Sequence, residues 1–146
     1  MKFFSLIFLV GVLSVIQAFG FSVFGVQPNL ALVAVISSCF FISFFWQGVL
    51  LTFLAGLILK FSPGFEIEIL IFSLICIIAI LVKKYLPWRF FFNNLILIVL
   101  GTLVFYFLLG ISLIPTFIFL KELILNVISG FLIFAILNWI WQNKNI

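Results

Sequence analysis

The chain has 146 residues, 68% of them hydrophobic and 7% charged, with a net charge of +4 and a mean hydropathy of +1.59. A soluble globular domain is about 45–50% apolar and about 25% charged, so this composition excludes an ordinary soluble fold. It excludes a disordered chain and a coiled coil for the same reason. We therefore expect a polytopic membrane protein with one domain over residues 1–146.

The segments of this domain are expected to be helices. Structures that cross a bilayer must satisfy their backbone groups internally, which leaves helices or a closed barrel. Barrel strands alternate apolar and polar residues. Runs such as Ile69–Val82 are apolar on every face. The sequence thus predicts an all-α bundle of six transmembrane helices.

The composition also removes much catalytic chemistry. The chain has no histidine and no aspartate, and its only acids are Glu66, Glu68 and Glu122. This excludes Ser–His–Asp relays, histidine-ligated zinc and aspartate clusters that hold magnesium. We expect no enzyme activity and no catalytic, cofactor-binding or metal-ligating residues. Nucleic-acid binding is not expected, because the chain lacks a basic soluble face.

The first half of the chain predicts three spans. The first, near 3–19, resembles a signal peptide, but the membrane spans that follow favour an uncleaved helix. Glycines and Pro28 then break the chain, and Asn29 is a helix start signal. The apolar run 29–61 is too long for one span, since 33 residues would extend about 50 Å. Polar and small residues at 43–48 predict a fold there, giving spans near 29–45 and 47–62, followed by a turn at Ser62–Gly64.

The second half predicts three more spans. A helix near 66–85 would carry glutamates in its first turn and lysines in its last, as the helix dipole favours. Pro87 ends it. A span near 92–111 and a loop over 112–121 follow, because Gly110 and Pro115 interrupt the apolar run. The sixth span is predicted near 122–141.

The charge distribution predicts the orientation. With six spans and a cytoplasmic N-terminus, five of the seven positive residues are cytoplasmic, as the positive-inside rule requires: Lys2, Lys83, Lys84, Arg89 and Lys144. A five-span alternative, with one helix over 29–61, would place four positive residues outside. We therefore expect a multi-pass membrane protein with both termini in the cytoplasm.

Two groups of residues are candidate functional positions. A membrane-interface belt is predicted at the cytoplasmic side, where tryptophan rings and basic side chains prefer to lie: Trp46, Lys83, Lys84, Trp88, Arg89, Trp139 and Trp141. Asn126 and Asn138 are candidates for hydrogen bonds between helices, either within the bundle or to the helix of a partner.

Several short motifs, in this order, resemble MreD, the small membrane subunit of the bacterial rod-shape machinery. They are the helix start Pro28–Leu32, Gly48 after a tight hairpin, the segment Gly56–Leu59 before Pro63–Gly64, the basic loop after the fourth span, and the final helix from Lys121 to Asn126. The family commonly has an acidic residue after the Gly-Leu motif, where this chain has Lys60.

The resemblance implies a non-catalytic scaffold that helps to organise lateral peptidoglycan synthesis. The implied partner is an MreC-like single-span protein, and through it RodA, a transpeptidase penicillin-binding protein and MreB. The implied fold is a six-helix bundle similar to the substrate-binding subunits of energy-coupling-factor transporters. The implied location is the bacterial inner membrane, and membrane lipid is the other expected contact.

Those transporter subunits supply the alternative function, a vitamin-binding S component. They bind a vitamin on the outer side, and small residues of their first helix contact the coupling subunit. Ser14 and Ala18 could imitate that contact. The predicted outer loops, however, hold few polar groups, and a ligand site needs several that converge.

Overall fold

The computed structural model describes residues 2–61 and 66–142, and these residues form an all-α fold, as predicted. Its helices are α1 (Lys2–Ala18), α2 (Leu30–Cys39), α3 (Phe45–Leu59), α4 (Glu66–Val82), α5 (Phe90–Leu109) and α6 (Phe117–Gln142). Short 3-10 turns, η1 (Lys83–Tyr85) and η2 (Ile111–Leu113), follow α4 and α5. The predicted turn at Ser62–Gly64 and Lys144 lie outside the described residues.

Two helices, α5 and α6, are long and apolar enough to cross a membrane, among the helices of the described segments. They pack against each other and are the longest elements of the bundle. Each of the six predicted ranges largely overlaps one α-helix, although the other four helices are shorter than these two.

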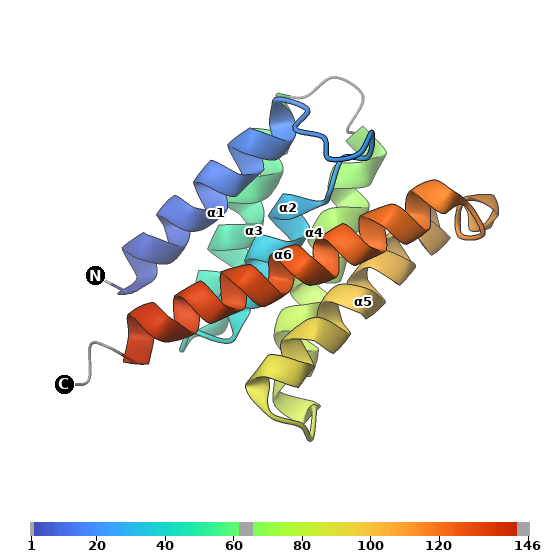
Figure 1. The fold of residues 1–146 in the computed structure, drawn as a ribbon. Coiled ribbons are helices and arrows are strands. Elements are labelled where there is room, and N and C mark those ends of the chain that lie inside the picture. Colours follow the sequence, from blue (N-terminus) through green and yellow to red (C-terminus); the bar gives the residue numbers. More distant parts are fainter. Residues whose placement is uncertain (1, 62–65, 143–146) are drawn as a thin grey trace.

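The short helix α2 occupies the centre of the bundle, and each of the other five helices contacts it (Figure 1). All ten of its residues are buried. A helix that is apolar on every side needs to be covered on every side, and the segment Leu30–Cys39 has this character. At about 15 Å it is half the length that a ~30 Å hydrocarbon core requires. It is therefore an interior helix surrounded by the rest of the chain.

The helices alternate in direction, so the molecule has two distinct ends. Ring contacts bring together the start of α1, the chain around 40–46 and the end of α6: the centroids of Phe3 and Trp46 are 5.7 Å apart and those of Phe41 and Trp141 are 5.3 Å apart. This is the basic end, defined by residues 2–4, 40–46, 83–90 and 139–141. The start of α1 and the end of α6 lie toward it (Figure 1).

The break between α2 and α3 lies at residues 40–44, earlier than the predicted fold at 43–48. Gln47 is part of α3, and its side-chain oxygen accepts hydrogen bonds from the backbone N–H groups of Ser43 (3.2 Å) and Phe44 (3.3 Å). The polar residue that suggested a break is thus the cap of the following helix.

The last helix begins at Phe117, five residues before the predicted start at 122. The hydroxyl oxygen of Thr116 accepts a hydrogen bond from the backbone N–H of Phe119 at 3.3 Å. Threonine is a favoured residue at this capping position. The sequence predicts a start at the charged residue Glu122, but the helix also includes the preceding apolar turn.

Candidate functional site

Three amide side chains surround the buried N-terminus of α2. Asn29 caps the helix itself, accepting from the backbone N–H of Leu32 at 3.2 Å. Gln17 of α1 accepts from the N–H of Ala31 at 2.8 Å, and Asn126 of α6 accepts from the N–H of Asn29 at 2.9 Å. The first N–H groups of a helix have no partner within it. Here residues from three elements supply the partners, so the helix start can be buried.

Asn126 also connects this helix start to α5. Its amide nitrogen donates to the hydroxyl oxygen of Thr102 at 3.1 Å, and that hydroxyl donates to the carbonyl of Ile98 at 2.9 Å. Asn126 is completely buried. The side chain therefore joins α6 to both α2 and α5, which is the type of contact predicted for it.

The other end of α2 is held by a charged side chain. The ammonium of Lys83 donates to the carbonyl oxygens of Cys39, the last residue of the helix, and of Ile42, which follows it. Cations are favoured near the C-terminus of a helix because the unpaired carbonyls carry partial negative charge. Lys83 thus acts inside the bundle as well as belonging to the predicted belt.

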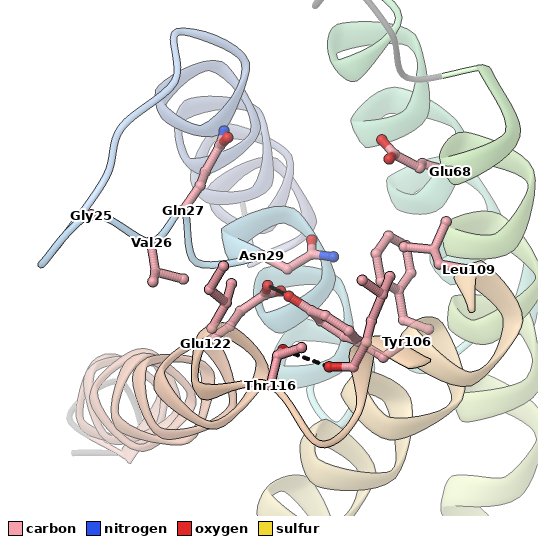
Figure 2. A pocket seen from close by; sticks show the side chains of 12 residues that line it. Gly25, Val26, Gln27, Asn29, Glu68, Tyr106, Leu109, Thr116 and Glu122 are labelled. Carbon is pink, nitrogen blue, oxygen red and sulfur yellow. Dashed lines mark hydrogen bonds between the residues drawn. The ribbon is translucent and has the colours of Figure 1, made fainter. Parts of the chain in front are cut away.

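A cavity of about 420 Å³ lies beside the start of α2, at the end of the bundle opposite the basic end. Its walls come from the loop before α2 and from α4, α5, η2 and α6 (Figure 2). The lining residues are Gly25, Val26, Gln27, Asn29, Glu68, Phe105, Tyr106, Leu109, Leu113, Thr116, Ile118 and Glu122.

The most buried acidic side chain of the described chain faces this cavity. Glu122 is 8% exposed, and its carboxylate accepts a hydrogen bond from the Tyr106 hydroxyl across the gap between α6 and α5. Figure 2 shows these two side chains meeting, with Glu68 of α4 on another wall. The loop wall is shaped by a tight turn in which Phe24 and Gly25 have φ of 52° and 77°.

The cavity offers hydrogen-bond acceptors and negative charge to a ligand. Within the described residues, no three of the metal-ligating types His, Cys, Asp and Glu lie together. The two cysteines, Cys39 and Cys76, are free and buried in the apolar core. The polar groups that could hold a ligand are therefore those of the cavity.

The predicted belt residues gather at the basic end. Trp46, Trp88 and Trp139 are exposed, and Trp141 packs against Phe41. Lys84 lies 4.8 Å from the centre of the Tyr85 ring, within cation–π distance. These positions share one end of the molecule, and their place at a membrane interface stays a prediction.

The second predicted asparagine lies elsewhere. Asn138 is on an exposed part of α6, whereas Asn126 is inside the bundle. Two other asparagines that the sequence reading did not select are buried in α5. Asn93 donates to the carbonyl of Trp88 at 2.8 Å, and Asn94 donates to the carbonyl of Gly130 at 3.4 Å.

The polar cavity was not predicted from the sequence. Tyr106 and Glu122 are 16 residues apart on different helices, and Gln27 belongs to a loop that reads only as a helix break. The sequence of α6 contains one indication of a polar site, because Glu122 and Asn126 are four residues apart and therefore lie on one face of the helix. That face points into the bundle.

Comparisons with known proteins add no assignment. No family model matches the chain, and neither a curated protein nor a solved structure matches it.

Proposed function

We propose that this protein is a non-catalytic scaffold of the bacterial elongation machinery that binds the transmembrane helix of an MreC-like partner. The supporting observation is that two of the motif residues behind the MreD resemblance, Asn29 and Gly48, lie at contacts between helices. Asn29 starts the central helix α2. A Cβ atom on Gly48 would lie 2.6 Å from Cδ1 of Ile80, so α3 and α4 approach closely there. These two motif residues therefore help to hold the bundle together.

The proposed location is the bacterial inner membrane, with cytoplasmic termini and six crossings of the chain, one of which the short interior helix α2 makes together with the loops on either side of it. The length and apolarity of α5 and α6 support membrane association. The gathering of Lys2, Lys84 and Arg89 at one end supports the orientation, since basic residues concentrate in cytoplasmic loops, and the tryptophans at the same end are typical of a membrane interface. Through the MreC-like partner, the scaffold would contact RodA, a transpeptidase penicillin-binding protein and MreB.

The surface that suits a single helix is the groove between α1 and α6. It measures about 450 Å³ and is lined by Phe4, Ser5, Phe8, Leu9, Ile136, Leu137, Ile140 and Trp141. Each of the two helices packs on α2, and the groove lies between them. Association of helices in lipid depends on close packing, which a groove allows over more area than a ridge. The groove also reaches the basic end, where the belt could anchor the partner.

Co-purification in mild detergent tests the proposal. The wild-type protein should retain an MreC-like subunit, and Leu9→Trp or Ile136→Trp should release it by filling the groove. Leu74→Trp, on an exposed part of α4, is the matched control and should retain the partner. If all three variants bind equally, the groove is not the partner surface. If the wild-type protein retains no MreC-like subunit, the scaffold proposal fails.

The cavity favours a second candidate, the vitamin-binding S component. It brings together polar side chains from several elements, which is what a ligand site requires. Co-purification with a coupling-factor transmembrane subunit, or a vitamin retained at stoichiometric level, would replace the scaffold proposal with this one.

A further inference from the structure

The cavity beside the start of α2 has an unusual balance of charge. Glu122 and Glu68 both line it, and none of the described lining residues is a lysine or an arginine. The neighbouring Lys121 does not compensate, because its ammonium lies over the ring of Phe117, 5.3 Å from the ring centre. Burying a carboxylate without a cation is costly. A positively charged ligand would offset that cost.

We propose that this cavity binds a small organic cation through a primary ammonium group. A primary ammonium has three N–H donors and no acceptor, whereas a carboxylate has only acceptor sites when ionised. The Glu122 carboxylate uses one site for the Tyr106 hydroxyl, whose own oxygen keeps acceptor capacity. The Glu68 carboxylate on another wall offers a further acceptor. The two acidic groups exclude an anionic ligand.

The rest of the cavity indicates that the cation is organic. Phe105, Leu109 and Leu113 provide apolar walls for a short hydrocarbon portion, and the Tyr106 ring can contact the charged nitrogen by cation–π attraction. A volume of 420 Å³ lies within the range of small-molecule sites, about 300–1,000 Å³, and far exceeds the space that one metal ion fills.

The ammonium group has two possible sources. It could belong to a soluble amine, or to the ethanolamine headgroup of a phospholipid, because the cavity lies at one end of the helices. The inference is independent of the scaffold proposal, since the cavity and the α1–α6 groove share no residue. Failure to find an MreC-like partner would leave it unchanged.

Binding of two probes to the full chain in phosphatidylglycerol nanodiscs tests the proposal. Putrescine and ethanolamine should bind saturably, while their neutral counterparts 1,4-butanediol and ethylene glycol should not. Glu122→Gln should weaken amine binding about tenfold or more, because a charged hydrogen bond is lost. Glu66→Gln removes the same charge from an exposed position outside the cavity and should change binding less than twofold. Glu68→Gln, on a partly exposed wall, repeats the test if Glu122→Gln does not fold.

A second measurement, with a phospholipid as the probe, distinguishes a lipid headgroup from a soluble amine as the source of the ammonium group. If the headgroup is the ligand, native mass spectrometry should find phosphatidylethanolamine on the wild-type protein and lose it in Glu122→Gln, and this lipid should compete with putrescine. If the ligand is soluble, discs containing phosphatidylethanolamine should leave putrescine binding unchanged. The proposal is overturned if the diols bind as well as the amines, if Glu66→Gln weakens binding as much as the cavity variants, or if neither amine nor phosphatidylethanolamine binds.

Discussion

The side-chain oxygen of Asn126 lies 2.9 Å from the backbone nitrogen of Asn29, 97 residues earlier in the chain. This bond ties the middle of α6 to the first turn of the central helix. It occurs in a fully buried position, where an unpaired N–H group would be costly. The geometry makes Asn126 a structural residue whose loss affects three helices together.

Replacement of Asn126 should therefore destabilise the bundle. In Asn126→Leu the N–H of Asn29 and the hydroxyl of Thr102 lose their shared partner, and we expect a loss of about 1–3 kcal/mol. Thermal unfolding followed by tryptophan fluorescence in one detergent would measure it. Ile128→Leu, on an exposed part of the same helix, is the control and should unfold at the wild-type temperature. Equal stability of the two variants would contradict the role of Asn126.

The contact between α5 and α6 at Gly130 should not tolerate a side chain. A Cβ atom there would lie 2.2 Å from Cδ1 of Ile98, which is completely buried. Gly130→Ala should cost about 1–3 kcal/mol of stability, as overpacking of a core does. Combining it with Ile98→Ala should recover part of the loss, because the second change removes the clashing atom.

Gly11→Ala provides the contrast for this prediction. Gly11 is also helical, and a Cβ atom there meets nothing within 4 Å. Since alanine has the higher helix propensity, this change should leave stability equal or raise it by up to about 1 kcal/mol. A loss of stability in Gly11→Ala as large as that in Gly130→Ala would show that close packing is not the cause.

Lys83 and Lys84 are neighbours that should differ in their effect on stability. Lys83→Met removes the donor to the carbonyls at the end of α2, and we expect a loss of about 1–3 kcal/mol, as for a hydrogen bond to a charged group. Lys84→Met changes an exposed residue and should stay within about 0.5 kcal/mol of the wild type. Both variants remove one positive charge from the same loop. Any change of membrane orientation should therefore be shared, whereas the change in unfolding temperature should not.

The orientation itself can be measured by cysteine labelling in cells. An impermeant maleimide should label single cysteines at the end that holds the cavity and should not label those at the basic end, if the positive-inside orientation is correct. Exposed positions suited to this test are Ser22 and Ser112 at the first end, and Ser43 and Tyr85 at the second. The reverse labelling pattern would refute the proposed orientation.

The single cysteines are introduced into the double variant Cys39→Ala/Cys76→Ala, which has no cysteine of its own. Both thiols are buried among apolar side chains, so small apolar replacements should fold. The variant without added cysteines should take up no label.

Much of the secondary structure could be predicted from the sequence. Apolar composition and the spacing of breakers indicated six helical segments, because helix formation and burial follow from local hydropathy and from glycine and proline. The predicted starts of α3 and α6 differ from the observed starts, and at both helices a side chain caps the first turn. Gln47 and Thr116 bond to backbone groups of their own neighbourhood, and such bonds depend on the conformation that the chain adopts.

The polar contacts were decided by the tertiary structure. Composition alone predicted a membrane protein, because the chain is far more apolar than soluble domains are, and it showed that the chain has no histidine and no aspartate. Which polar side chains meet depended on how the helices pack around α2. Asn29, Thr102 and Asn126 come together only because α2, α5 and α6 converge there, and the same convergence brings Tyr106 to Glu122. The local sequence determines which residues share one face of a helix. The direction in which that face points, and the helices that it contacts, result from the packing of the whole bundle.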